Sequence, residues 1–513
     1  MAMTETRPET GATAATASEQ AGPGGLEILV GSGDHRTTGV VFIGFSLLFL
    51  VISFIVRALV GIDVLTDNGV LGGFGTLSNL SSQVGLVLLG VVPLILGLAI
   101  YVVPMQVGSP AIAFPRAVTL SLWTWVLGSA VFITSAALNG GIGGGNDEAS
   151  RLGNVSLGVL LLALGLGTVA VMTTVVAHRP FGMGLARVPL FSWSMLVGGA
   201  VWIISFGSAF AHVIVGQISQ SGAEALATNF SNGIAWMLRA PSVYMIAIPV
   251  LGIAGDVVAR AANRRLANYF VFQSFIGAFA VLSFGAWVQS PTAVRTAVWT
   301  VVALLVGLPV LGLLGGLADT LRRGPVKLDA AVVGSLLSLL LLLGAVAAGL
   351  LIALDNAGTG QLIGFNNAEL AASQAFFAVG AALTGAISGL FGWSPLIFGR
   401  SEKKGAATGA VLLTVGGTAL MATAALLAGL VQIDGKDTGY QAFAVLGALG
   451  ALGALLGVVA TLSATLGAAR AGDEEGAEEL SGLTLEWAGS AQPLDAPPVQ
   501  SAFPLLDAAE ENA

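Results

Sequence analysis

Histidine, the side chain that most often binds redox metals, is rare in this sequence. The chain has three histidines, His35, His178 and His212, and it has no cysteine. Neutral imidazole ligates iron or copper at neutral pH, and thiolates hold iron–sulfur clusters. The missing cysteine excludes disulfides and thiolate metal sites. Only His212 lies inside a long apolar run, so a centre built from several imidazoles is not predicted. A heme held by methionine stays conceivable, although no spacing indicates one.

Charged residues within or at the ends of apolar runs include two pairs that need an explanation. Arg239 and Glu369 fall inside predicted membrane segments, where an unpaired charge costs a few kcal/mol or more. Either they form a structural ion pair that helps to fill the protein's centre, or each reaches the interface separately. Asp256 and Asp319, near the ends of such runs, are expected to meet basic turns.

The elements that must position these residues are predicted to be membrane helices. Charged residues make up 9% of the 513 residues, and the mean hydropathy is +0.89, which excludes an ordinary soluble enzyme. Apolar stretches of about 20 residues can span a bilayer. The sequence predicts an all-α integral membrane fold of twelve transmembrane helices, at 38–60, 83–105, 118–139, 154–177, 192–217, 232–258, 268–289, 293–319, 330–354, 369–398, 405–432 and 441–469.

Two of these spans have features that require close neighbours. Pro93 leaves a backbone carbonyl without its usual donor, which a neighbouring span can satisfy. Gly447, Gly450, Gly453 and Gly457 give the last span a small-residue face, which favours close helix contact either within the chain or with a partner.

Basic residues fall mostly in the turns on one side. With the N-terminus inside, the outer turns hold only Arg151, Arg295 and Lys436, and the cytoplasmic turns hold Arg116, Arg179, Arg187, Arg260, Arg264, Arg265, Arg322, Arg323, Lys327, Arg400, Lys403 and Lys404. This bias predicts that both termini are cytoplasmic.

The two ends of the chain are predicted to be polar extensions of a membrane domain at 34–470. Residues 1–33 have the composition of a disordered segment and no apolar run of signal-peptide type. Residues 471–513 form an acidic cytoplasmic tail without Lys or Arg, so no nucleic-acid partner is expected.

Short sequences along most of the chain resemble the catalytic subunit, subunit I, of heme–copper terminal oxidases (cytochrome c oxidase). GLAIYVVPMQVGSPAIAFPR, residues 97–116, resembles that family's second span and the loop after it. Further resemblances are Asp34-His35-Arg36, His178 to Ser194, Trp236 to Gly255, Trp393-Ser394-Pro395, and Thr484 to Trp487 followed by Pro497-Pro498. The resemblance implies a subunit I-like bundle over about residues 34 to 503.

The resemblance also implies where that family binds its metals, through six histidines. The corresponding positions here are Ser82 for the low-spin heme, Ala240 and the pair Gln289-Ser290 for copper, and Ser373 and Ala375 for the two hemes. Ser242 and Ala111 replace carboxylates of the family's proton routes. No heme or copper is therefore expected.

We therefore predict a redox-silent subunit I-like protein, a structural or assembly subunit of a respiratory oxidase complex in a bacterial plasma membrane. Its expected partners are membrane lipid and other oxidase subunits or an intact subunit I paralogue, with Leu485, Glu486 and Trp487 as a partner contact. Two alternatives stay open: an active heme–copper oxidase that reduces oxygen with electrons from cytochrome c, and a transporter that reuses the bundle.

Overall fold

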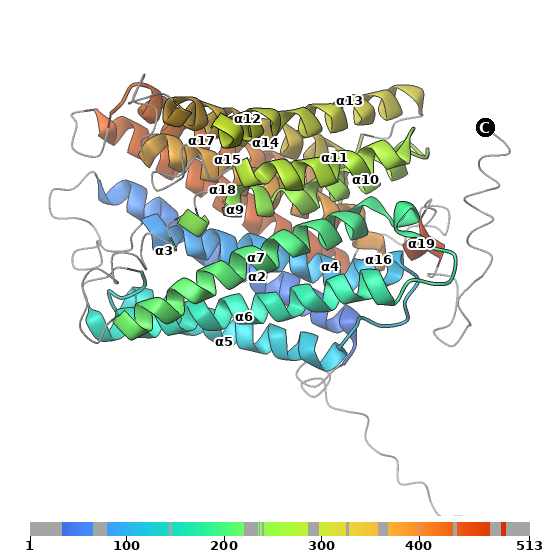
Figure 1. The fold of residues 1–513 in the computed structure, drawn as a ribbon, viewed down its shortest axis with the longest axis horizontal. Coiled ribbons are helices and arrows are strands. Elements are labelled where there is room, and N and C mark those ends of the chain that lie inside the picture. The colour runs from blue at the N-terminus through green and yellow to red at the C-terminus, as the bar shows by residue number, and fades with distance from the viewer. Residues whose placement is uncertain are drawn as a thin grey trace, which may run out of the picture.

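The computed structural model is a bundle of long helices whose axes are roughly aligned (Figure 1). The structure describes residues 33–64, 79–142, 146–219, 234, 236–238, 241–285, 297–324, 328–357, 368–399, 401–433, 439–471 and 484–488. Within these ranges every regular element is helical, and eleven helices are long and apolar enough to cross a membrane. The predicted all-α membrane fold is confirmed.

The spans consist of α2 (His35–Asp63), α3 and α4 (Asn79–Val84 and Val92–Gln106, joined by the π-helical segment Gly85–Val91), α5 (Pro115–Ala137), α6 (Asp147–Ala177), α7 (Leu190–Ser219), α9 and α10 (Pro241–Met245 and Ile248–Ala261), α12 and α13 (Ala297–Leu305 and Gly307–Arg323), α14 (Ala330–Ala357), α15 (Ala368–Gly392), α17 (Lys404–Leu430) and α18 (Tyr440–Ala471). Short helices are α16 (Ser394–Phe398) and α19 (Leu485–Ala488).

The seventh predicted span, residues 268–289, corresponds to α11 (Tyr269–Leu282), which is shorter than the eleven spans. Residues 286–289 lie outside the described part of the chain. Twelve crossings therefore stay a prediction. The positions of the described ends favour it: a Cβ built on Gly33 would lie 4.0 Å from Pro115, and α19 contacts Gln106, at the other end of the same turn. A chain whose two ends lie on the same side of a membrane must cross that membrane an even number of times.

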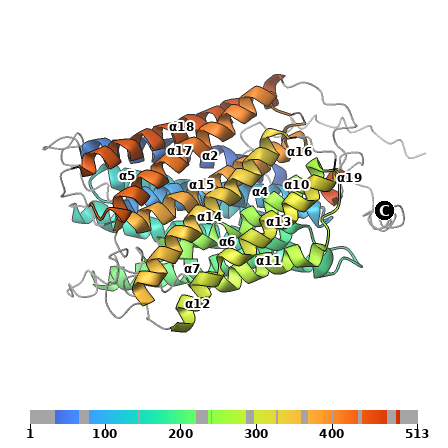
Figure 2. The ribbon, with the colours of Figure 1, turned by 90° about the horizontal axis from the view of Figure 1, so that it is seen from above.

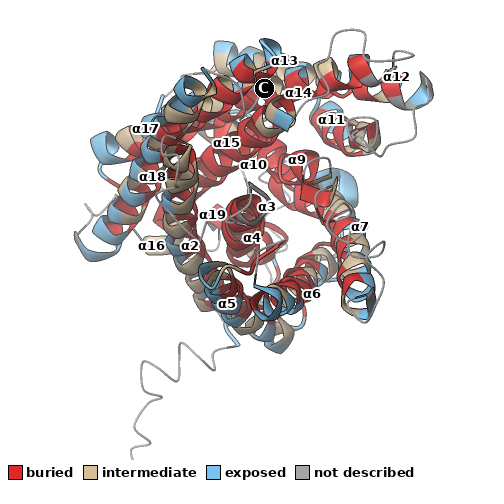
Figure 3. Ribbon diagram, turned by 90° about the vertical axis from the view of Figure 1, so that its left-hand side faces the viewer, coloured by how far each residue is buried: buried red, intermediate tan, exposed pale blue. Residues whose placement is uncertain are grey.

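Two helices form the centre of the bundle. The apolar windows of the Ser82–Gln106 span and of α15 are entirely buried, whereas those of α13 and α18 are only one-third buried. An end view shows α4 inside a ring that includes α2, α5, α6 and α7 (Figure 3). A helix that is apolar on all sides is suited to such a position, and the outer helices can present their apolar faces to lipid.

The small-residue face of α18 packs against α17 within the same chain. The two helices run side by side (Figure 2). A Cβ at Gly450 would lie 2.7 Å from the Gly417 carbonyl oxygen, and one at Gly457 would lie 2.5 Å from the Thr414 amide nitrogen. Gly447 has no such neighbour. Of the two alternatives for this face, the structure therefore supports contact within the chain for Gly450 and Gly457.

A π-helical turn in the central span accommodates Pro93. Here the Val92 amide donates to the Val87 carbonyl, five residues back. The next carbonyl in this register, that of Leu88, would need the amide hydrogen that Pro93 lacks. The indole of Trp125 on α5 donates to Leu88 instead, at 3.1 Å. The expected donor from a neighbouring span is therefore confirmed, and it is Trp125.

We predict that Trp125→Phe lowers the free energy of unfolding by about 1–3 kcal/mol, because it leaves the buried Leu88 carbonyl without a donor. Phenylalanine keeps much of the ring that stacks on Phe42. Trp123→Phe is the matched control, because the Trp123 indole nitrogen has no hydrogen-bond partner within the described residues. Thermal unfolding in one detergent compares the two variants, and equal losses would contradict the assignment.

Candidate functional site

The described positions that correspond to metal ligands lie together at the buried centre. Ser82 and Ser373 are buried, and the Ser373 hydroxyl donates to the Ala422 carbonyl on α17 at 2.9 Å. The neighbouring Gln374 donates to the Tyr244 hydroxyl at 3.2 Å. These polar groups are thus engaged in contacts between helices. Ala240, Gln289, Ser290 and Arg239 lie outside the described residues.

A small cavity lies among these positions. Its lining includes Gln83, Ser242 and Ala375, together with apolar side chains of the central helices. Its volume is about 10 Å³, whereas pockets for drug-sized ligands measure roughly 300–1,000 Å³. A volume of this size has room for about one water molecule. The side-chain oxygen of Gln83 is buried without a hydrogen-bond partner among the described residues.

Small residues along α15 bring its neighbours into close contact. A Cβ at Gly385 would lie within 2.4 Å of Val250 on α10, and one at Gly380 within 2.7 Å of the Thr418 hydroxyl on α17. Any larger side chain at either position would force these helices apart. The centre is therefore packed by close approach of helices, as the Gly- and Ala-rich spans suggest.

The three histidines occupy separate places. The Nδ1 atom of His35, at the start of α2, lies 3.7 Å from Asp34. His178, after α6, lies 3.3 Å from the Ser109 hydroxyl, and His212 on α7 contacts the Ser208 carbonyl of its own helix at 2.8 Å. Among the described residues, no group of three or more histidine or acidic side chains is arranged to hold a metal ion.

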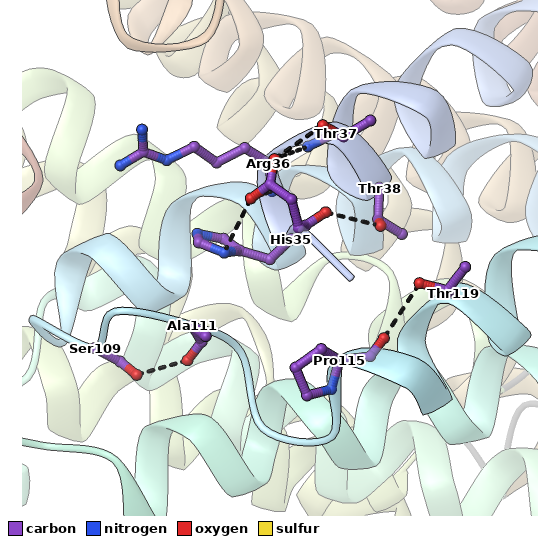
Figure 4. Close-up of polar contacts among 9 residues, drawn as sticks. His35, Arg36, Thr37, Thr38, Ser109, Ala111, Pro115 and Thr119 are labelled. Carbon is purple, nitrogen blue, oxygen red and sulfur yellow. Dashed lines mark hydrogen bonds and ion pairs between the residues drawn. The ribbon is translucent and has the colours of Figure 1, made fainter. Parts of the chain in front are cut away.

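The loop after α4 passes the start of α2 (Figure 4). Ala111, where the resemblance places an aspartate, contributes only its backbone: its carbonyl accepts a hydrogen bond from Ser109 at 2.6 Å. Partial burial of Asp34 works against its ionisation, but hydrogen bonds from Thr37 and the Arg36 amide outweigh it and lower the pKa of Asp34. Asp34 therefore acts as an N-cap for α2.

Glu369 meets Tyr440 and Arg57, neither of which was predicted as its partner. The Tyr440 hydroxyl donates to Glu369 at 3.0 Å, and Arg57 on α2 interacts electrostatically with both. The Arg57 guanidinium also lies 4.6 Å from the ring centroid of Phe376 on α15. The predicted pair with Arg239 is not tested. Sequence reasoning missed Arg57, although it is the one charged residue inside the first predicted span, 38–60.

The two aspartates near helix ends behave differently. Asp319 pairs with Arg322 at 3.4 Å and with Arg323 at 2.8 Å, as expected. For Asp256 the expectation was incomplete: its carboxylate accepts from the amides of Leu190 and Phe191 at 3.1 and 3.0 Å. It thereby binds the N-terminus of α7, where backbone amides favour an anion.

The short helix α19 packs against its own bundle. Glu486 and Trp487 are buried, with 2% and 5% of their surfaces exposed, and Leu485 is half-buried. Gln106 at the end of α4 donates to Glu486 at 3.2 Å, and Arg260 lies 3.8 Å above the Trp487 ring. Burial raises the pKa of Glu486. The predicted partner contact thus has little available surface at Glu486 and Trp487, and it stays a prediction for Leu485.

Fold and centre together define a polytopic α-helical membrane protein with a packed interior. A family model described as "Cytochrome C and Quinol oxidase polypeptide I" matches residues 37–459, so the chain belongs to this family.

Similar proteins include the heme-copper oxidase subunit I+III of Aeropyrum pernix, 26% identical over 416 residues, 72% of this chain and 49% of that protein. The quinol oxidase subunit 1 of Bacillus subtilis is 27% identical over 216 residues, 38% of this chain and 33% of that protein. A probable cytochrome c oxidase subunit 1-alpha of Streptomyces coelicolor is 25% identical over 286 residues, 50% and 48% of the two chains. The match thus spans half or less of each relative's length.

The described centre does not fit the heme and copper that the family implies. In proteins these metals are bound by imidazole, thiolate, thioether or phenolate groups. Ser373 instead supplies a hydroxyl that is bound to Ala422, and Ala375 supplies a methyl group. The cavity beside Ala375 is of water size. No chemical step through a metal can be derived from these residues.

We predict that Gln83→Leu leaves the free energy of unfolding unchanged or raises it by about 1 kcal/mol, because it removes a buried carbonyl that has no hydrogen-bond partner within the described residues. Gln374→Leu is the matched variant. It should cost about 1–3 kcal/mol, because it removes the donor to Tyr244. Thermal unfolding of both variants in one detergent tests this difference. A loss at Gln83 as large as that at Gln374 would contradict it.

We predict that Glu369→Gln lowers the free energy of unfolding by about 1–2 kcal/mol, a value reduced for its partial exposure. Glu148→Gln is the control, since Glu148 is also the second residue of its helix but is exposed. This comparison removes the contribution of the helix dipole. Equal stability of the two variants, measured by thermal unfolding, would reject a structural role for the Arg57–Glu369–Tyr440 cluster.

Proposed function

We propose that this chain is a redox-silent member of its family and acts as a structural or assembly subunit of a respiratory oxidase complex. The number of histidines carries the proposal. By resemblance, the family's two hemes and copper take six imidazoles, and this chain has three. His35, His178 and His212 contact different residues, which are Asp34, Ser109 and the Ser208 carbonyl.

The packing of the centre supports the same proposal. Ser373 and Gln374, at or beside the predicted ligand positions, bind other helices. Gly380 and Gly385 allow α17 and α10 to approach α15 closely. Such contacts stabilise the bundle through protein atoms alone, as a subunit without prosthetic groups would need.

Other respiratory oxidase subunits, or an intact subunit I paralogue, are the partners that this role requires. Relatives are named as oxidase subunits, and one carries subunits I and III in a single protein. Several come from bacteria, which favours a bacterial plasma membrane. The outer apolar faces of helices such as α13 and α18 suit contact with lipid.

Purification in mild detergent, followed by separation of the isolated chain in a stronger one, tests the proposal. We expect oxidase subunits to co-purify in the first step. The isolated chain should show no Soret band and no stoichiometric copper, because it lacks the ligands. An intact subunit I treated in parallel is the control for cofactor loss. Stoichiometric heme or copper in the isolated chain would favour an active oxidase, and a lone stable monomer would favour a transporter.

A further inference from the structure

The side chain of Gln106 joins four elements at the face of the bundle where the described chain begins and ends. Its amide nitrogen donates to Asp256 on α10 at 2.9 Å and to Glu486 on α19 at 3.2 Å. Its amide oxygen accepts from the backbone amide and the hydroxyl of Ser192 on α7, at 3.2 and 2.6 Å. One buried amide thus holds two carboxyl groups.

The two carboxyl groups have different surroundings. Asp256 accepts hydrogen bonds from the first two amides of α7 as well as from Gln106. These donors stabilise an anion. Glu486 is 2% exposed, and its Oε2 atom has no hydrogen-bond partner within the described residues. The carboxyl group of Glu486 also accepts hydrogen bonds from Thr484 and Trp393. Both anions thus have donors, and one proton shared between the two acids removes the repulsion between two negative charges that meet at one amide.

Several other charged or titratable groups face this pair. Arg260 stacks on Trp487 and donates to the Gly392 carbonyl. Tyr269, at the start of α11, interacts electrostatically with both acids and with Arg265, while its hydroxyl donates to Val188 at 2.8 Å. Arg260 therefore holds the aromatic side of α19, and the acid pair holds the other side.

We propose that the Asp256–Glu486 pair binds one proton while α19 is docked, and that loss of this proton releases α19 from the bundle. With both acids ionised, Gln106 would hold two negative charges in a buried site, which is strongly unfavourable. A group that is protonated more readily in the docked state favours docking at low pH, and this contribution disappears as the pH rises. α19 is then a latch that opens at higher pH. This inference does not depend on whether the chain is redox-silent.

The chain has no cysteine, so one introduced thiol reports the position of α19 in the full-length protein. Gly489→Cys places it directly after α19, and Gly476→Cys, in a separate variant, is the reference in the acidic tail. Each variant is labelled with a maleimide, and the rate for Gly489→Cys is divided by the rate for the reference variant. We expect this ratio to rise about tenfold from about pH 5 to about pH 8. The ratio cancels the common effect of pH on thiol reactivity.

Two substitutions assign the effect. Glu486→Gln stays neutral, so the labelling ratio should remain low throughout the pH range. Glu479→Gln removes one charge from the same tail and should keep the full rise. A flat ratio in the unsubstituted background would overturn the proposal, as would an unchanged rise in Glu486→Gln. The first result needs no change at Glu486, so it does not depend on whether that variant folds.

Discussion

Polar groups inside a membrane protein must find their partners within the protein, because lipid offers none. The centre of this bundle is organised by that requirement. The Leu88 carbonyl, left without a donor by Pro93, binds the Trp125 indole. Ser373 and Gln374, beside each other on α15, bind Ala422 on α17 and Tyr244 on α9. Each contact joins one helix to another, so satisfying the polar groups also fixes how the helices are arranged.

The same requirement explains which parts of the fold were predictable from sequence. The length of an apolar run depends on the thickness of the lipid layer, so it indicates the spans directly. The distribution of arginines indicates the orientation, which stays a prediction. Pro93 indicated that a donor was needed, but not that Trp125 would supply it. Trp123, two residues away on α5, has the same indole, and only the packing of α5 against the π-helical turn distinguishes the two.

The side-chain clusters were less predictable because their members are distant in sequence. An ion pair between Glu369 and Arg239 was one of two alternatives from the sequence, and it stays a prediction. The contact observed for Glu369 is with Tyr440, and Arg57 lies close by. Asp256 was expected to meet basic turns, but Gln106 and the α7 amides bind it. The sequence around Gln106 and α19 does not indicate these contacts, because Gln106 reaches α7, α10 and α19 only in the tertiary fold. The residues Leu485 to Trp487 were predicted to contact a partner, but Glu486 and Trp487 are buried against the bundle, so this contact stays a prediction for Leu485.

A bundle that has lost a prosthetic group faces a definite energetic cost. An unfilled cavity destabilises a protein by about 24 cal/mol per Å³, so a void of roughly 300 Å³ would cost roughly 7 kcal/mol, comparable with the whole stability of many domains. Gly380 and Gly385 allow the helices around α15 to close in, and the cavity beside Ala375 is about 10 Å³. Under the proposed function, this close packing is what lets the family's scaffold persist without its cofactors. The same packing argues against a wide transport path through the described centre, because any such path would have to separate α15 from α10 and α17.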